Sequence, residues 1–245
     1  MHRFYADAEG EVSPGIFQLS KEDSHHALNV LRLKKADQVE LITGGQRFLS
    51  VIRDIADNAV SVQTLSPLPS TEPGLRIVLL QGLPKGDKME WIVQKAVELG
   101  VSAIVPVAMT RCIVRLDQRD GEKKAERWQK IAREAGKQSG RCRIPEVHAP
   151  VRFHELAGIT ADLDAVIVPW ELSRDHGPKA FCQEHPDLHS LGILIGPEGG
   201  ITEEEMEALR RMGCESVTLG KRILRTETAG IAAISAIMAL YGEME

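Results

Sequence analysis

The stretch LGILIGPEGGITEEEMEALRRMG, from Leu191 to Gly213, joins an apolar strand, a glycine turn and a helix. Open α/β sheets bind their ligands at the carboxyl ends of parallel strands, so this turn is a candidate site by its position alone. Gly196, Gly199 and Gly200 leave the backbone open to a sharp turn or to the close approach of another group. Thr202 is followed three residues later by Glu205, a capping box that explains much of the acidity at the start of the helix.

The chemistry of this turn disfavours a phosphate ligand. The turn has neither a Walker lysine nor the spacing Gly-x-Gly-x-x-Gly, and Glu198 together with the helix carboxylates would cancel the positive end of the helix. A neutral or cationic ligand that hydrogen-bonds to backbone groups is favoured instead. S-adenosylmethionine, an adenosine that carries a sulfonium cation, fits this description.

Similar strand and helix patterns surround this stretch. They alternate along the chain, which predicts an α/β fold with a mostly parallel sheet covered on both faces. The expected strands are residues 75–82, 101–109, 163–170, 191–196 and 216–220, and the expected helices are residues 87–99, 121–137 and 229–240. The last helix is apolar nearly all round, which predicts burial within the fold or at a subunit interface.

The first 70 residues have a different pattern and predict a separate β-rich domain. The segment QVELITGGQRFLSVIRDIADNAVSVQTL gives three strand-like runs, separated by Gly44-Gly45 and Asp57-Asn58. Ser24 can cap a short helix, HHALNVLR. The proline-rich segment 66–74 is the expected linker. We therefore expect one domain over residues 1–70 and a second over residues 74–245.

Composition and cysteine spacing narrow the class of protein. The chain has 245 residues, of which 43% are hydrophobic and 27% are charged, as in an ordinary globular protein. We expect no membrane span and no signal peptide, and hence a cytoplasmic protein. The four scattered cysteines argue against a zinc site or a disulfide framework. The pair His25 and His26 has no third ligand nearby and is interpreted as a helix-surface pair, so no metal is expected.

Charge is distributed unevenly although the formal net charge is −5. Residues 111–152 hold twelve Lys and Arg against six Asp and Glu, whereas residues 196–245 hold five against nine. Within the basic region, one helix face is expected to carry Lys130, Arg133 and Lys137. Together with the nearby Gln138, these side chains suit contacts with phosphate and sugar groups. A solvated helix end with cations near its C-terminus explains the same residues.

A second glycine turn, TLGKRILRTETAGIAAI, also follows a strand and precedes a helix, which Thr226 or Thr228 could cap. Two such turns in the final third of the chain make a shared ligand pocket plausible. Arg222 and Arg225 could bind phosphate or pair with nearby carboxylates, and the pairing is favoured.

Four separated motifs, GPEGG, LGKRILRTETA, KGDKMEWIVQKAVELGV and REAGKQSGR, occur in an order that resembles one family. This family is the bacterial 16S ribosomal RNA uridine N3-methyltransferases of the SPOUT superfamily, and the resemblance extends from HHALNVLRLKKAD to the C-terminus. It implies an N-terminal PUA-like β-barrel that binds RNA and a C-terminal SPOUT-type α/β domain with a deep trefoil knot. It also implies a homodimer formed through the C-terminal helix.

The resemblance further implies which residues form the sites. The implied cofactor-binding residues are Pro169, Glu171, Leu172, Ile195, Gly196, Gly199, Gly200, Leu219, Gly220, Ile223, Leu224, Arg225, Thr228 and Ala229. The implied RNA-binding residues are Arg32, Lys34, Lys85, Lys88, Arg133, Lys137, Gln138 and Arg141.

The reaction implied is methyl transfer from S-adenosylmethionine to N3 of a uridine in RNA of the small ribosomal subunit. A protonated N3 is a poor nucleophile, so the site must remove the proton or stabilise the resulting anion. Arg225 is the candidate for stabilising charge on the uracil oxygens, and Glu171, Glu198 and Glu227 are candidate bases that the sequence does not rank. The alternatives are a related SPOUT enzyme acting on ribose or guanine, and a non-catalytic RNA-binding assembly factor.

Overall fold

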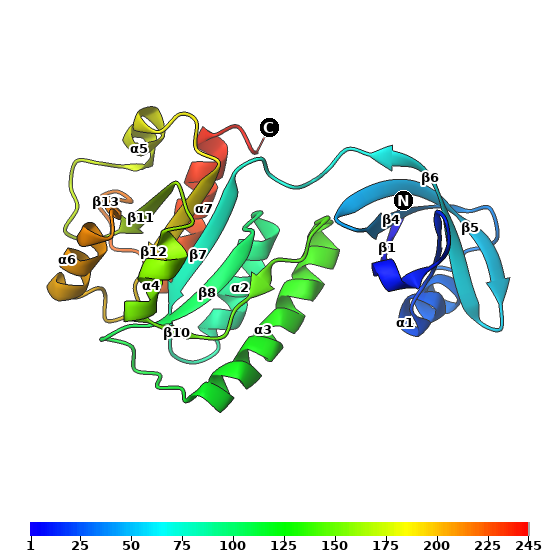
Figure 1. Cartoon of the computed structure of the whole chain (residues 1–245), viewed down its shortest axis with the longest axis horizontal. Helices are drawn as coiled ribbons and strands as arrows, with labels where there is room; N and C mark the ends of the chain where they lie inside the picture. Colours follow the sequence, from blue (N-terminus) through cyan, green and yellow to red (C-terminus); the bar gives the residue numbers. More distant parts are fainter. Residues whose placement is uncertain (245) are drawn as a thin grey trace. The chain divides into compact units, whose positions relative to one another are not determined.

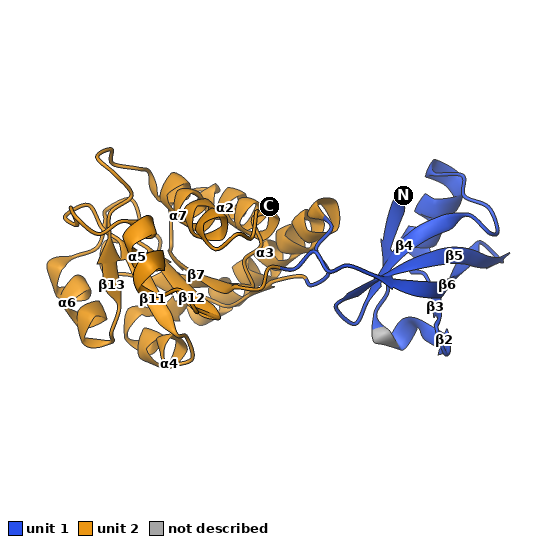
Figure 2. Ribbon diagram, turned by 90° about the horizontal axis from the view of Figure 1, so that it is seen from above, with its two compact units in different colours: residues 1–72, 140–143 blue, residues 73–139, 144–245 orange. Residues whose placement is uncertain are grey.

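The computed structural model describes residues 1–244, except for the side chain of Ala8. The chain divides into two compact units (Figure 2). The N-terminal unit holds residues 1–72 and 140–143, and the C-terminal unit holds residues 73–139 and 144–245. No helix among the described residues is long and apolar enough to span a bilayer.

The N-terminal unit is built on a six-stranded sheet with the order β1-β4-β5-β6-β3-β2. Its strands are β1 (His2–Tyr5), β2 (Glu11–Ser13), β3 (Ile16–Gln18), β4 (Gln38–Thr43), β5 (Gln46–Ala56) and β6 (Ala59–Leu68), with the short helices η1 (Ala8–Gly10), α1 (Lys21–His25) and η2 (His26–Val30). The strands β4, β5 and β6 form antiparallel hairpins. Gly44, Gly45, Asp57 and Asn58 all have positive φ, as two-residue hairpin turns require. The three predicted strands and both turns are confirmed.

Two details of this unit differ from the sequence-based prediction. The helix begins at Lys21 and its N-cap is Ser20, whose hydroxyl accepts a hydrogen bond from the Asp23 backbone N–H at 3.0 Å. Ser24 lies inside this helix and is buried, and its hydroxyl accepts from Val60 N at 3.2 Å instead of capping. Strand β6 also extends to Leu68, into the expected linker, because Pro67 and Leu68 still pair with β5.

The C-terminal unit contains a seven-stranded, entirely parallel sheet with the order β10-β8-β7-β12-β11-β13, and β9 pairs with β8 (Figure 1). Its strands are β7 (Arg76–Gly82), β8 (Ala103–Ala108), β9 (Glu146–Val147), β10 (Val151–Arg152), β11 (Ala165–Pro169), β12 (Ser190–Ile195) and β13 (Glu215–Val217). Every residue of β12 is buried, as expected for a central parallel strand covered on both faces.

Helices cover both faces of this sheet, with α2, α3 and α7 on one side and α4 and α6 on the other (Figure 2). The helices are α2 (Lys88–Glu98), α3 (Gln118–Ser139), α4 (Leu156–Thr160), α5 (Pro178–Glu184), α6 (Glu203–Arg211) and α7 (Thr226–Leu240), with the short turn η3 (Phe153–Glu155). Ala125, Trp128, Ala132 and Ala135 form the buried apolar stripe of α3. The helix itself is longer than expected at both ends.

Helix α7 packs against β7, β12 and α2. The buried face of α7 carries Gly230, Ala233, Ile234, Ile237 and Met238. The opposite face is also apolar but only partly covered, and Leu240 at its end is 45% exposed. Helix α7 is therefore apolar on two faces, of which one is buried in the core and the other is only partly covered.

Candidate cofactor-binding and active site

The candidate site lies at the carboxyl ends of β7, β12, β11 and β13. The chain leaves β7 toward β8 on one side, whereas β12 pairs on the other side of β7, so the order of the strands reverses here. Such a reversal is where open parallel sheets form ligand crevices. The ends of β7 and β12 come close together, because a Cβ on Gly82 would lie 2.7 Å from the backbone N of Pro197.

Two adjoining hollows open at this edge of the sheet. The larger has a volume of about 840 Å³ and the smaller about 100 Å³. The larger is lined by Lys85, Lys88, Pro169, Glu171, Ile195, Gly196, Pro197, Glu198, Gly199, Gly200, Ile201, Ile223, Leu224, Arg225, Thr226 and Ala229. The smaller shares five of these residues and adds Trp170, Arg174, Thr218, Leu219, Gly220, Lys221 and Arg222.

The structure gathers most of the residues that the sequence analysis nominated for the cofactor. All of them line one of the two hollows except Leu172, which is exposed on the loop after β11, and Thr228, which is exposed in the first turn of α7. Lys85 and Lys88, nominated for RNA, also line the larger hollow. The nominated residues do not include Pro197, Ile201 and Thr226 of the larger hollow or Trp170, Arg174, Thr218, Lys221 and Arg222 of the smaller one, although most of them are immediate neighbours of nominated residues.

The glycines of the first turn are required by the loop itself. Gly200 has φ +73°, a left-handed conformation that favours glycine. A Cβ on Gly196 would lie 2.8 Å from Ile201 Cγ1, and a Cβ on Gly199 would lie 2.8 Å from Arg111 Cβ. Arg111 also donates from Nη1 to the Gly199 carbonyl at 3.0 Å. Because Gly199 has no side chain, the segment around Arg111 can pack directly against its backbone.

Thr226 ties three elements together at the floor of the larger hollow. Its hydroxyl donates to the Gly196 carbonyl at 2.7 Å and accepts from Gln81 Nε2 at 2.9 Å. The prediction that Thr226 or Thr228 caps the last helix is wrong. The N-cap is Arg225, which makes no capping bond with its side chain, because the Thr226 hydroxyl is used between β7 and β12.

Lys88 joins two of the candidate bases. Its Nζ lies 2.9 Å from Glu198 Oε1 and 3.0 Å from Glu227 Oε2. Burial by itself would raise the pKa of both carboxyls, but the ammonium of Lys88 and nearby backbone N–H groups outweigh this and lower both pKa values. The same two carboxylates raise the pKa of Lys88. At neutral pH, all three groups are therefore charged.

The capping box at the start of α6 is confirmed. Glu205 N donates to Thr202 Oγ1 at 3.1 Å, and Thr202 N donates to Glu205 Oε2 at 3.0 Å. The second oxygen, Oε1, accepts from Thr110 N at 2.8 Å, so the buried Glu205 also holds the loop that follows β8. This carboxylate has a structural task and is not available to a ligand.

Trp170 adds a free donor at the smaller hollow. Its ring packs under the guanidinium of Arg210, whose Cζ lies 5.2 Å from the ring centroid. Its Nε1 is buried and has no hydrogen-bond partner among the described residues. Buried donors are normally satisfied, so this N–H is a candidate contact for an acceptor atom of a ligand.

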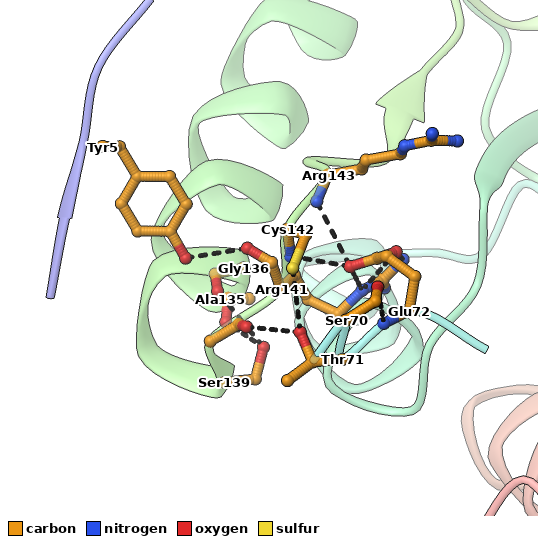
Figure 3. A network of polar contacts seen from close by, with 11 residues as sticks. Tyr5, Ser70, Thr71, Glu72, Ala135, Gly136, Ser139, Arg141, Cys142 and Arg143 are labelled. Atoms are coloured by element: carbon orange, nitrogen blue, oxygen red, sulfur yellow. Dashed lines mark hydrogen bonds and ion pairs between the residues drawn. The ribbon is translucent and has the colours of Figure 1, made fainter. Parts of the chain in front are cut away.

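The residues nominated for RNA fall in different environments. Arg133 and Gln138 are exposed on α3, and Arg32 and Lys34 are exposed in the N-terminal unit. Arg141 is buried within the N-terminal unit at 4% exposure, and its Nη2 lies 2.6 Å from Glu72 Oε2 (Figure 3). The expected availability of Arg141 to RNA therefore does not agree with the structure, because its charge is already neutralised by a buried carboxylate.

Glu72 gathers several donors from residues 140–143. It accepts from Cys142 N at 2.7 Å and from Arg143 N at 3.2 Å in addition to the Arg141 guanidinium (Figure 3). Burial alone would raise the pKa of Glu72, and the bonds from Arg141 and the two backbone N–H groups reverse this and lower it. The ion pair thus fastens residues 140–143 to the end of the N-terminal segment.

The histidines add no metal ligand to the site. His25 and His26 are exposed on the helix surface, as interpreted from sequence. One group in the described residues, His176, Glu184 and Glu215, has ligand atoms within 4.8 Å of one another, but none of them lines either hollow.

Comparison with known proteins identifies the family. The model of an RNA methyltransferase domain matches residues 71–238, and that of an RNA methyltransferase PUA domain matches residues 19–65. The chain belongs to the RNA methyltransferase family. Ribosomal RNA small subunit methyltransferase E of Bacillus subtilis (strain 168) is 38% identical over 90% of this chain and 89% of its own length.

Solved structures of this RNA methyltransferase family agree in fold. Ribosomal RNA small subunit methyltransferase E from Neisseria gonorrhoeae, bound to S-adenosyl methionine, is 33% identical with a TM-score of 0.80 and 98% of both chains covered. A methyltransferase from Legionella pneumophila in complex with the bound cofactor SAM is 34% identical with a TM-score of 0.77, covering 97% of this chain and 96% of its own. The expected fold class, a SPOUT-type α/β domain after a PUA-like sheet, is confirmed.

Proposed function

We propose that this protein transfers a methyl group from S-adenosylmethionine to N3 of a uridine in 16S RNA of the small ribosomal subunit. The observation that carries the proposal is the glycine-lined hollow at the reversal point of the parallel sheet, inside the matched RNA methyltransferase domain. Relatives of about one-third identity over nearly the whole chain are named for this RNA or described with this cofactor bound.

The residues of the hollow fit the cofactor. Its volume of about 840 Å³ lies within the usual range for small-molecule sites. The carboxylates of Glu171 and Glu198 at its wall would favour a sulfonium, and the orphaned Trp170 Nε1 would donate to an acceptor of the ligand. When bound, the cofactor supplies an electrophilic methyl group. Residues 169–172, 196–200 and 219–229 would hold it, and we propose that these loops form the trefoil knot.

The chain must then dispose of the uridine N3 proton. Glu198 and Glu227 are ion-paired with Lys88, and a carboxylate with a lowered pKa is a weakened base. Glu171 lines the same hollow and has no ion-pair partner among the described residues, so we propose it as the proton acceptor. Arg225, exposed at the hollow, would stabilise the negative charge that develops on the uracil oxygens.

Two further parts of the proposal concern the assembly and the RNA. We propose a cytoplasmic homodimer in which the partly covered apolar face of α7 packs against a partner, supported by the exposure of Leu240. Light scattering of Leu240→Glu should then show a smaller particle than the wild type, and an unchanged mass would contradict this interface.

RNA would contact Arg32, Lys34, Arg133, Lys137 and Gln138.

The reaction is tested with purified protein, S-adenosylmethionine and unmodified small-subunit RNA, followed by nucleoside mass spectrometry. We expect N3-methyluridine. A ribose 2′-O-methyl group or N1-methylguanine would support a related SPOUT activity instead. No methylation together with no S-adenosylmethionine binding in calorimetry would support the assembly-factor alternative. Glu171→Gln should lower kcat by a much larger factor than it weakens cofactor binding if Glu171 accepts the proton.

A further inference from the structure

The structure shows which exposed cations of the basic region have no carboxylate partner. Arg127 is paired with Glu90 at 2.6 Å, and Arg141 is paired with Glu72. By contrast, Arg115 and Arg152 have no carboxylate within ion-pair distance among residues 1–244, and both are exposed. These two arginines are 37 positions apart in sequence but line the same hollow.

This third hollow, of about 370 Å³, lies in the C-terminal unit beside the loop that follows β8. It is lined by Ala108, Met109, Thr110, Val114, Arg115, Leu116, Arg152, Phe153 and His154. Its lining contains two arginines and a histidine but no carboxylate, whereas the larger hollow combines Lys85, Lys88 and Arg225 with Glu171 and Glu198. The lining charge therefore favours a polyanion here, whereas the lining of the larger hollow carries both signs of charge.

We propose that this hollow binds the backbone of an unpaired RNA strand. Guanidinium groups bind phosphate oxygens through paired N–H donors, which suits Arg115 and Arg152. Phe153, half-buried, and His154, exposed, offer rings on which an unstacked base can pack. An acidic protein segment would use the arginines but would have less use for the rings. This inference rests on the proposed function.

The loop of residues 109–116 places such a strand next to the glycine turn. On one side it lines the hollow, and on the other Arg111 Nη1 donates to the Gly199 carbonyl at 3.0 Å. The buried Cys112 fixes the loop, because its Sγ accepts from Met109 N at 3.3 Å. An RNA strand held by Arg115 and Arg152 would therefore be held at a fixed position relative to the proposed methyl-donor site.

The test measures binding of a fluorescently labelled, uridine-rich single-stranded RNA by anisotropy across a salt series. Removing one arginine that binds a phosphate should reduce the slope of log K against log salt by about 0.7, which corresponds to about five-fold weaker affinity at roughly 0.1 M salt. We expect this for Arg115→Gln and for Arg152→Gln, and about twice the slope change for the double variant. Lys179→Gln, which removes an exposed cation of α5, is the matched control and should change little.

Three further outcomes decide the inference. It is overturned if the double variant binds RNA with the affinity and salt slope of Lys179→Gln, or if the wild type does not bind RNA. It is also overturned if polyglutamate displaces RNA from the wild type as well as unlabelled RNA does, since the hollow would then accept acidic chains in general. Calorimetry with S-adenosylmethionine separates the two claims, because failure of the wild type to bind cofactor counts against the proposed function and not against this hollow.

Discussion

Replacing Thr226 by valine tests the polar connection beneath the larger hollow. Valine keeps the shape of the side chain but removes the hydroxyl that donates to the Gly196 carbonyl at 2.7 Å and accepts from Gln81 Nε2 at 2.9 Å. The site is buried, since Thr226 is 6% exposed and Gln81 is fully buried. The perturbation therefore leaves polar groups without partners at a largely buried position.

The magnitude follows from these partners. A buried carbonyl left unsatisfied costs about 1–3 kcal/mol, and the missing bond from Gln81 adds about 1 kcal/mol. Gln81 Nε2 keeps its bond to the Gly82 carbonyl at 3.0 Å, so its cost stays small. We expect Thr226→Val to lower the free energy of unfolding by about 2–4 kcal/mol. Thr226→Ser keeps the hydroxyl and removes one buried methyl, which costs about 1 kcal/mol.

Urea denaturation followed by tryptophan fluorescence measures this difference. Trp91, Trp128 and Trp170 all belong to the C-terminal unit, so the signal reports on that unit. Because the hydroxyl holds the carbonyl of Gly196, cofactor affinity measured by calorimetry should fall more for the valine than for the serine variant. If the valine variant is as stable as the serine variant within about 0.5 kcal/mol, the hydroxyl does not connect these elements as we infer.

Three other perturbations test separate parts of the site. Gly199→Val should push against Arg111 and weaken cofactor binding at least ten-fold in calorimetry, whereas Gly158→Ala, which meets nothing within 4 Å, should not. Glu72→Gln should lower the Tm of the N-terminal unit in calorimetry at pH 7. Because the folded-state pKa of Glu72 is lowered, its stabilisation is present above the ordinary value of 4.5 and is lost as pH falls, so the difference from wild type should narrow in acid. Lys88→Met should raise the pKa of its two carboxylate partners but leave the acid limb of the pH–rate profile in place, because we propose Glu171 as the base; a limb moved to higher pH would assign the rate to one of the two partners.

Local sequence signals predicted the elements well where short-range chemistry decides. The hairpin turns at Gly44-Gly45 and Asp57-Asn58 and the capping box of Thr202 depend on residues within a few positions of each other, so their geometry could be predicted. The cap of α1 was misplaced because Ser20 and Ser24 are equally suited to the task locally. In the folded chain Val60, far along the sequence, donates to the Ser24 hydroxyl, and Ser20 caps the helix.

In the candidate site, too, short-range features could be predicted from the sequence and long-range pairings could not. Glycine turns after apolar strands located most of the larger hollow, because the carboxyl ends of parallel strands share one edge of the sheet. The charge state of its carboxylates could not be predicted, since Lys88 is more than a hundred positions from Glu198 and Glu227. Pairing across such distances depends on which strands become neighbours.

The sequence by itself determined the strand and helix pattern, the glycine turn unsuited to phosphate, and the motifs that resemble one RNA methyltransferase family. Tertiary structure alone decided which charges are available. It buried Arg141 against Glu72, placed Lys88 between two glutamates, and left Arg115 and Arg152 exposed around one hollow. The physical reason is that a turn or cap depends on neighbouring residues, whereas the availability of a charge depends on the partner that folding brings to it.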